Sequence, residues 1–167
     1  MSLPGLPFDG EHIIDSSAAL SLPSVPKVLG VIGAGVVGLE LGSVWRQLGA
    51  KVTILEATEN LLPAADLQIA REALRQFKKQ NLNIQLDCRV TGATAMNNGC
   101  EVVYIQGEHE LKLTVDKLVV AIGRQPNTDD LFDPATGLTL DSRGFIEVDE
   151  NCLTGEHNVW AIGDSVR

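Results

Sequence analysis

Hydrophobic residues first concentrate in residues 28–32, a short apolar run that stops at Gly33. A helix pattern follows over residues 36–48, in which the apolar residues three and four positions apart are Val37, Leu41, Val44 and Leu48. Gly49 then stands where helices commonly end, and residues 51–56 form a second apolar run. The pattern predicts a strand, a helix and a second, parallel strand.

The next stretch predicts another helix and strand of the same kind. After a loop over residues 60–65, Asp66 is placed as the N-cap of a helix that runs through Gln80. The expected buried stripe of this helix is Leu67, Ala70, Leu74 and Phe77. Residues 82–86 then predict the third parallel strand.

The period of the pattern changes to two after residue 87. Residues 88–95, 101–106 and 110–115 are short, alternating, β-rich runs, and Asn98-Gly99 and Gly107-Glu108 separate them as hairpin turns. Residues 117–123 return to the apolar pattern of a buried parallel strand. We therefore predict an α/β fold: a Rossmann-like βαβ nucleotide-binding domain with a parallel sheet, in which a three-stranded antiparallel meander replaces one crossover helix.

The two ends of the chain have weaker patterns. Residues 1–26 are rich in Pro and Ser and predict a connector without a site, containing a short strand at Ile13 and Ile14 and a helical turn over residues 16–20. Residues 144–149 and 158–164 predict two further strands. The expected divisions are a connector over residues 1–26, a nucleotide-binding domain over 27–150, and a last strand with the return of the chain over 151–167.

Glycines at the first strand-to-helix junction carry the clearest chemistry. Gly33, Gly35 and Gly38 form G-x-G-x-x-G, with Val36 and Val37 between the last two. In a dinucleotide-binding unit the first glycine permits the tight turn, the second lets the backbone approach a pyrophosphate, and the third lets the helix lie close to the strand. The helix N-terminus supplies N–H groups and a positive dipole end for the phosphates. The alternative is a tight turn that binds nothing.

An acidic residue ends the second strand. Glu56 lies 18 residues after Gly38, close to the spacing of a carboxylate that binds the adenosine ribose. A ribose 2′-phosphate at this place would meet a like charge, worth about 4 kcal/mol at about 4 Å and an effective dielectric constant near 20. No Arg or Lys occurs in residues 56–62 to offset that repulsion. We therefore predict NAD rather than NADP.

Composition narrows the class of partner. The chain has 167 residues, 44% of them hydrophobic, and a net charge of −9, which argues against nucleic acid and anionic membranes as partners. It contains no apolar run near 18 residues and no signal-peptide pattern, so we expect a cytoplasmic protein. Three widely spaced cysteines without C-x-x-C predict reduced thiols and no metal site.

A second candidate position follows the strand over residues 117–123. Gly123 permits close approach of the backbone, and Arg124 leaves the strand at its carboxyl end, the edge at which open α/β sheets bind ligands. Arg124 is therefore a candidate for contact with a phosphate or a ribose. The alternative is an exposed arginine in a turn.

Three motifs in this order resemble a known family. They lie in residues 31–42, 120–127 and 154–164, and residues 20–26 and 144–149 agree as well. In these stretches the sequence is similar to the pyridine-nucleotide–disulfide oxidoreductases, especially the members that oxidise dihydrolipoamide. The agreement covers nearly the entire chain, and the acidic Glu56 resembles the NAD-using members.

The resemblance implies specific roles for residues. Gly33, Gly35 and Gly38 would hold the NAD pyrophosphate, and Glu56 would hold the adenosine ribose. Glu40 resembles a glutamate near the nicotinamide carboxamide and the flavin, although an acid in the first turns of a helix also stabilises the helix dipole without a ligand. Gly123 would lie against the cofactor. Asp164 resembles the aspartate that binds the ribityl chain of FAD.

The departures from the family pattern are equally informative. The chain has no C-x₄-C disulfide motif, no earlier glycine fingerprint for FAD and no His-Pro segment for acid–base catalysis. We therefore expect the NAD-binding domain of a longer enzyme, inactive alone, with FAD bound only in the full-length protein. Its partners would be NAD(H) and the missing FAD and interface domains. The resemblance also implies a homodimer that can join a 2-oxoacid dehydrogenase complex.

Two alternatives remain open at this stage. The domain could serve another flavoprotein disulfide reductase, of the mercuric reductase, transhydrogenase or coenzyme A disulfide reductase type, because the disulfide substrate does not touch this domain. A free-standing nucleotide-binding module is the other alternative, and it predicts tight binding of NAD or NADH.

Overall fold

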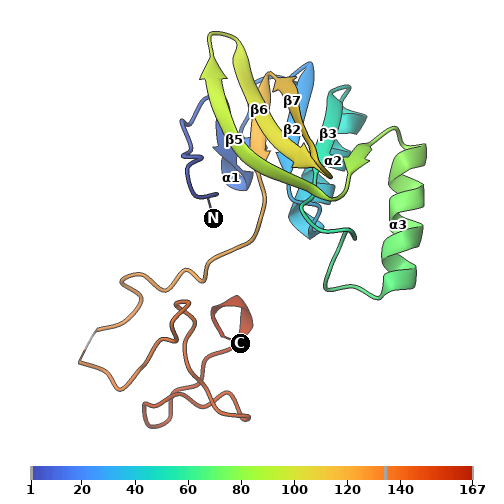
Figure 1. Cartoon of the computed structure of the whole chain (residues 1–167). Helices are drawn as coiled ribbons and strands as arrows, with labels where there is room; N and C mark the ends of the chain where they lie inside the picture. Colours follow the sequence, from blue (N-terminus) through green and yellow to red (C-terminus); the bar gives the residue numbers. More distant parts are fainter. Residues whose placement is uncertain (1, 134, 167) are drawn as a thin grey trace. The chain divides into compact units, whose positions relative to one another are not determined.

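Figure 1 shows the computed structural model of the chain, which describes residues 2–133 and 135–166. Two compact units divide between Gly123 and Arg124. The predicted boundaries after residues 26 and 150 stay a prediction, and residues 13–15 of the expected connector pair with the main sheet. The prediction that the two ends of the chain adjoin a flavin domain stays a prediction. Residues 1 and 167, at those ends, lie outside the described ranges.

Five parallel strands form the main sheet of the first unit, in the order β1-β8-β2-β3-β4. They are β1 (Ile13–Asp15), β2 (Val28–Ile32), β3 (Lys51–Leu55), β4 (Asn83–Gln85) and β8 (Lys117–Val120). The predicted parallel sheet is confirmed. Because β2 lies between β8 and β3, the carboxyl ends of these three strands meet around the glycine turn that follows β2.

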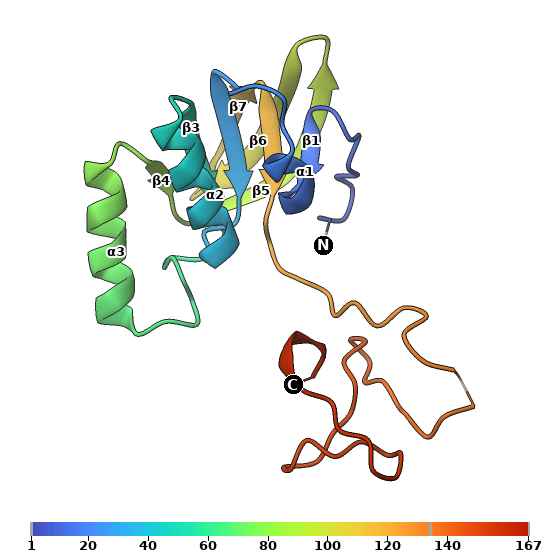
Figure 2. The same ribbon diagram turned by 180° about the vertical axis from the view of Figure 1, so that it is seen from behind.

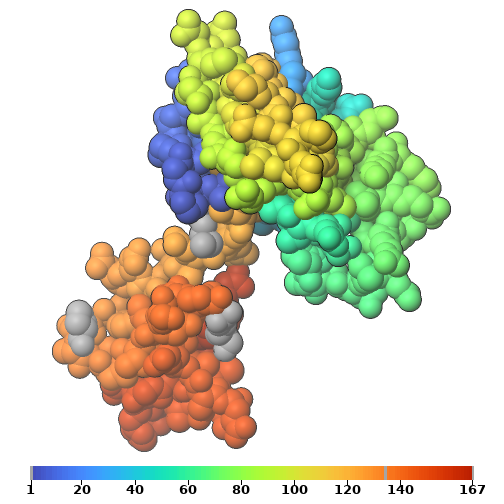
Figure 3. All heavy atoms as spheres, viewed as in Figure 1, coloured from blue at the N-terminus to red at the C-terminus, as the bar shows by residue number. Residues whose placement is uncertain are grey.

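Different elements cover the two faces of this sheet. The helices α1 (Ser16–Leu20), α2 (Val36–Gln47) and α3 (Leu67–Lys79) lie on one face, seen from the front in Figure 2. The antiparallel strands β5 (Cys88–Met96), β6 (Gly99–Gln106) and β7 (His109–Val115) lie on the other. In the space-filling view these strands hide the parallel sheet behind them (Figure 3). The α/β class and the three-stranded meander are confirmed.

Alternation along the buried strands builds two hydrophobic cores. Successive side chains of a strand point to opposite faces of a sheet. Val31 and Ile54 accordingly join the core beneath the helices, whereas Ile32 and Leu55 join the core beneath the antiparallel strands. All four side chains are at most 5% exposed. A continuous apolar run was therefore the correct signal for strands that are covered on both faces.

One hairpin turn differs from its prediction by one residue. The turn between β5 and β6 is formed by Asn97 and Asn98, and Gly99 is already the first residue of β6. Gly99 has φ of 133°, and a Cβ there would lie 2.2 Å from the carbonyl oxygen of Val115. Gly99 thus serves close packing against β7 as well as the turn. Gly107 and Glu108 form the second turn as predicted.

Helix α2 packs through its glycine side, as the third motif glycine predicted, but most of its aliphatic stripe is not buried. Its buried residues are Gly38, Leu39, Leu41, Gly42 and Trp45, and of the predicted stripe only Leu41 is among them. Val44 and Leu48 are 53% and 56% exposed. The two glycines explain this packing, because the side without side chains can approach the strands closely. Gly49, with φ of 110°, follows the C-cap as predicted.

Helix α3 begins as predicted but packs with a narrower stripe. The Asp66 carboxylate accepts the backbone N–H of Gln68 at 2.8 Å and caps the helix. Ala70 is buried, and Leu74 and Phe77 are half-buried against the core. Leu67 remains 44% exposed, so its predicted burial is wrong. Leu67 stands at the first position of the helix.

The close approach at Gly38 yields a prediction for stability. A Cβ on Gly38 would lie 2.0 Å from the carbonyl oxygen of Gly33, whereas a Cβ on Gly42 would meet the flexible end of Ile54 at 2.9 Å. We expect Gly38→Ala to lower the free energy of unfolding by about 2–3 kcal/mol. Gly42→Ala should change it by less than about 1 kcal/mol, since Ile54 can move and alanine favours the helix. Equal losses in urea-induced unfolding of the two variants would contradict this account.

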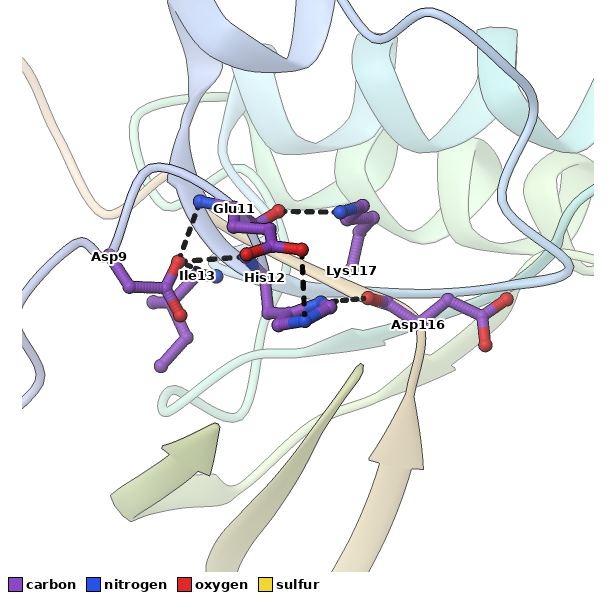
Figure 4. A network of polar contacts seen from close by, with 6 residues as sticks. All are labelled: Asp9, Glu11, His12, Ile13, Asp116 and Lys117. Atoms are coloured by element: carbon purple, nitrogen blue, oxygen red, sulfur yellow. Dashed lines mark hydrogen bonds and ion pairs between the residues drawn. The ribbon is translucent and has the colours of Figure 1, made fainter. Parts of the chain in front are cut away.

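Polar contacts bind the N-terminal segment to the main sheet (Figure 4). The Asp9 carboxylate accepts the backbone N–H groups of Glu11, His12 and Ile13 at 2.7–2.8 Å. Nδ1 of His12 lies 3.2 Å from the carbonyl oxygen of Asp116, and the Lys117 ammonium donates to the carbonyl of Glu11. The predicted short strand and helical turn are confirmed as β1 and α1, and β1 is an edge strand of the sheet rather than part of a connector.

The second unit, described over residues 124–133 and 135–166, is mostly irregular. The predicted strands over 144–149 and 158–164 are wrong: those segments form only isolated bridges and the short 3₁₀ turn η1 (Gly163–Ser165). A strand needs a continuous neighbour, and this unit supplies single bridges such as Leu153 with Trp160. Trp160 and Ile162 are 57% and 75% exposed, so the apolar pattern of the last segment is not satisfied within the unit.

Candidate functional site

A tight glycine turn joins β2 to α2. Gly33 has φ of +102°, a region that side chains disfavour, and its N–H donates to the carbonyl of Leu55 at 2.8 Å. A Cβ on Gly33 would lie 2.6 Å from the carbonyl oxygen of Ala121 at the end of β8. The turn is thus enclosed by the two neighbouring strands, and Gly33 and Gly38 have the structural roles that the motif predicts.

Gly35 differs from the other two motif glycines, because it faces open space. Its backbone is extended, with φ of −75° and ψ of −179°, and no described atom beyond its chain neighbours lies within 4 Å of a Cβ built on it. Gly35 is also the N-cap of α2, and within the described chain no side chain caps this helix end. Val36 and Val37 begin the helix here. The turn therefore presents bare backbone beside a helix N-terminus.

The carboxylate of Glu56 points at this turn from the end of β3. Its Oε2 accepts the backbone N–H of Ala34, the residue between Gly33 and Gly35, at 2.6 Å. Its Oε1 accepts the N–H of Thr58 at 2.9 Å and the Thr58 hydroxyl at 2.8 Å. The residue is only 9% exposed. Three donors therefore hold a nearly buried charge next to open backbone, without any ion pair to Glu56 among the described residues.

The backbone around Glu56 is fixed by the neighbouring strands. Its N–H donates to the carbonyl of Gln85 at 2.9 Å, and its carbonyl accepts the N–H of Cys88 at 2.8 Å. The loop that follows is joined to the glycine turn by a bond from the N–H of Leu62 to the carbonyl of Ala34 at 3.1 Å. The position of the carboxylate thus follows from sheet geometry and from contacts on both sides of the loop.

An apolar groove of about 930 Å³ runs along the exposed side of α2. Val36, Val37 and Glu40 line it from the first turns of that helix, and Leu20 of α1 lines it from the side. Val36 and Leu20 are 61% and 77% exposed. Glu40 therefore lines this groove near the start of α2, on the side of the helix that the sheet does not cover.

Arg124 and Asp164 lie together in the second unit. The Arg124 guanidinium donates to the Asp164 carboxylate, and the two side chains are 73% and 78% exposed. Exposed ion pairs of this kind contribute about 0–1 kcal/mol to stability. Arg124 is therefore an exposed residue whose partner is another candidate site residue, and its contact with a phosphate or a ribose stays a prediction. Gly123, the last residue of the first unit, has φ of 148°.

The cysteines form neither a redox pair nor a metal site among the described residues. Cys88, Cys100 and Cys152 are free thiols, and no group of three metal-binding side chains occurs in the described ranges. Burial raises the pKa of the Cys100 thiol to about 11, with a further contribution from the charge of Asp9. Burial also raises the pKa of Cys88. Both thiols are therefore protonated and unreactive at neutral pH.

No described helix has the length and apolar character needed to cross a bilayer.

Sequence reasoning missed Ala34 and Thr58, the two residues that hold the Glu56 carboxylate. Ala34 acts through its backbone N–H, for which no residue type gives a signal. Thr58 acts through its backbone N–H and its hydroxyl, and the signal was an acid followed two positions later by a hydroxyl residue, a spacing at which short polar side chains commonly bond to nearby groups.

The chain is similar to known proteins over nearly its whole length. The model of the family described as pyridine nucleotide-disulphide oxidoreductase matches residues 1–167. The chain is 51% identical over 166 residues to a dihydrolipoyl dehydrogenase of Cupriavidus necator, covering 99% of the chain and 35% of that protein. It is 44% identical to dihydrolipoyl dehydrogenase 3 of Pseudomonas putida, covering 97% of the chain and 35% of the relative. The chain thus spans about a third of the length of these curated relatives.

Solved structures show the same fold. The chain superposes on LpdA from Mycobacterium tuberculosis with a TM-score of 0.84 and 26% identity, over 99% of the chain and 36% of that protein. It superposes on the HOCl-induced flavoprotein disulfide reductase RclA from Escherichia coli with a TM-score of 0.82 and 34% identity, over 99% and 38%. With the family model matching throughout, the chain belongs to the pyridine nucleotide-disulphide oxidoreductase family.

Proposed function

We propose that the chain is the NAD(H)-binding domain of an FAD-dependent dihydrolipoyl dehydrogenase. The relatives named above support the enzyme class, and the glycine turn supports the cofactor. One observation carries the assignment to NAD(H): the open backbone at Gly35 lies beside a carboxylate that is held on the neighbouring residue, Ala34.

A dinucleotide pyrophosphate fits the turn for two reasons. Phosphate oxygens need close N–H donors, and the absence of a side chain at Gly35 leaves the N–H groups of Val36 and Val37 accessible at the start of α2. Residues 36–47 form a helix of three turns, long enough to present a positive dipole end to the same phosphates. Gly33 and Gly38 permit the tight turn and the close packing of α2, which fix the position of these N–H groups.

The adenosine ribose would lie at Glu56. Ribose hydroxyls are donors, and a carboxylate that is already fixed in place loses little further entropy when it accepts them. A 2′-phosphate would instead bring a second negative charge to a nearly buried carboxylate that forms no ion pair with any described cation. We propose NAD(H) as the cofactor on this ground.

FAD belongs to the proposed full-length protein, where it would exchange hydride with the nicotinamide. Asp164 is proposed to face the flavin ribityl chain, which requires that its ion pair with Arg124 opens or shares the carboxylate. Glu40 is proposed to lie near the nicotinamide carboxamide and the flavin, and Gly123 is proposed to lie against the cofactor. The homodimer, the association with a 2-oxoacid dehydrogenase complex and the cytoplasmic location are proposals of the same kind.

A second candidate follows from the similarity to RclA, whose name describes a flavoprotein disulfide reductase. Under this candidate the chain would bind NAD(H) in the same way, but the enzyme would reduce a different disulfide or oxidant. The turn and Glu56 do not distinguish the two candidates, because neither contacts a disulfide substrate.

Titration of the purified 167-residue chain with NADH and NADPH tests the proposed function. We expect weak saturable NADH fluorescence enhancement, at least about a hundredfold weaker NADPH binding because of charge repulsion, no bound flavin and no lipoamide-dependent NADH formation. Preferred binding of NADPH would contradict the assignment of Glu56. Turnover of dihydrolipoamide by this chain alone would contradict its role as a cofactor-binding domain.

A further inference from the structure

The hydroxyl of Thr58 lies between two acceptors. Its Oγ1 is 2.8 Å from Oε1 of Glu56 and 2.7 Å from the carbonyl oxygen of Asn60. A threonine hydroxyl has one proton, so it can donate to only one of these oxygens at a time. Thr58 is exposed, and a bond from the N–H of Asp87 to its carbonyl oxygen at 3.0 Å fixes its backbone. The hydroxyl can therefore turn while the residue stays in place.

The number of free acceptor sites on Glu56 limits how many ribose hydroxyls it can bind. A carboxylate has about four lone-pair sites. In Glu56, the N–H of Ala34, the N–H of Thr58 and the Thr58 hydroxyl use three of them. One site then remains, although the adenosine ribose of NAD carries two free hydroxyls. If the Thr58 proton turns to Asn60, a second site on Glu56 opens.

We propose that Thr58 is a positioning residue that acts through Glu56 on the adenosine ribose. In the empty site its hydroxyl donates to Glu56 and holds the carboxylate toward the turn. In the complex the proton turns to the Asn60 carbonyl, so that the oriented carboxylate has a second site free to accept a ribose O–H. This inference rests on the proposed NAD(H) site and adds to it the residue that orients the ribose acceptor.

Two variants of Thr58 separate the hydroxyl from the rest of the residue. Thr58→Val keeps the branched shape and the backbone N–H but removes the hydroxyl, and Thr58→Ser restores a hydroxyl without the methyl group. We expect Thr58→Val to weaken NADH binding about fivefold, because the Glu56 carboxylate loses the hydroxyl that holds it toward the turn, and Thr58→Ser to bind within about twofold of the original chain. The thermal midpoint reports whether all variants remain folded.

A double-mutant cycle with Glu56 distinguishes this role from a general effect on the loop. In a Glu56→Ala background the hydroxyl has no carboxylate to orient, so adding Thr58→Val should change NADH affinity by less than about twofold. A structural role in the loop would weaken binding in both backgrounds. We would abandon the inference if Thr58→Val bound NADH as tightly as the original chain or more tightly, if the loss persisted without Glu56, or if serine failed to restore binding.

The same titrations distinguish a failure of the Thr58 role from a failure of the proposed NAD(H) site. If the original chain binds NADH and any of these three results is found, Thr58 has no positioning role while the NAD(H) site stands. If the folded original chain shows no NADH binding, both the proposed NAD(H) site and the role of Thr58 are contradicted.

Discussion

A Gly35→Val variant should remain folded and lose NADH binding by more than about a hundredfold, equivalent to about 2.7 kcal/mol. The backbone of Gly35 is extended, a conformation that valine adopts readily, and the space around its Cβ is open. The fold therefore tolerates the side chain. The branched side chain would fill the space in which a pyrophosphate must approach the first N–H groups of α2. Fluorescence titration with NADH, together with a thermal unfolding curve, measures both parts of this expectation.

Gly92→Val provides the matched control. Gly92 lies in β5 of the antiparallel sheet, and a Cβ there also has no described neighbour within 4 Å outside its own chain neighbours. The same substitution in equally open space should therefore leave NADH binding unchanged. If Gly35→Val still binds NADH with the affinity of the control, the glycine turn does not contact the pyrophosphate.

Local patterns predicted the parts of the fold that depend on local geometry. The apolar run before Gly33 and the run before Glu56 correctly indicated β2 and β3, because strands covered on both faces are apolar throughout. The change of period after residue 87 correctly indicated the antiparallel strands. The N-cap at Asp66 was also found, since a capping side chain bonds to a residue only two positions away.

Spacing predicted the packing of α2 only in part. The motif glycine Gly38 correctly indicated close packing of the helix on the sheet, whereas the aliphatic stripe included Val44 and Leu48, which remain exposed. Apolar periodicity ranks side chains by hydrophobicity, whereas close approach of a helix to a sheet favours positions without side chains. This difference explains why the glycines mark the packed side of α2, whereas part of the aliphatic stripe stays exposed.

The strands predicted near the end of the chain failed for another physical reason. The alternation around Ile162 is typical of a strand, yet a strand forms only where a neighbour accepts and donates its backbone hydrogen bonds. Within the described second unit the segment finds only isolated bridges, and Ile162 stays 75% exposed. The candidate site was predictable in its glycines and in Glu56, whereas the contacts of Thr58 depend on side-chain torsions that no pattern encodes.

Glu56→Ala should narrow the preference for NADH over NADPH by about a hundredfold or more. Loss of the carboxylate removes charge-assisted hydrogen bonds to the ribose, worth about 1.5–3 kcal/mol each, so NADH binding falls at least tenfold. NADPH binding rises, because the repulsion of about 4 kcal/mol between the carboxylate and a 2′-phosphate disappears. Parallel titrations with NADH and NADPH measure the ratio. An unchanged ratio would remove Glu56 from the ribose site.

Glu56→Ala should also lower the stability of the fold. The buried N–H of Ala34 loses its acceptor in Glu56→Ala, which should lower the free energy of unfolding by about 1–3 kcal/mol. Glu56→Asp separates charge from reach, since it keeps the negative charge but is one methylene too short to hold the 2.6 Å bond to Ala34. It should therefore lose stability and NADH affinity like alanine while still excluding NADPH. If Glu56→Asp admitted NADPH as readily as Glu56→Ala does, the geometry of the turn rather than the charge of Glu56 would determine the choice of cofactor.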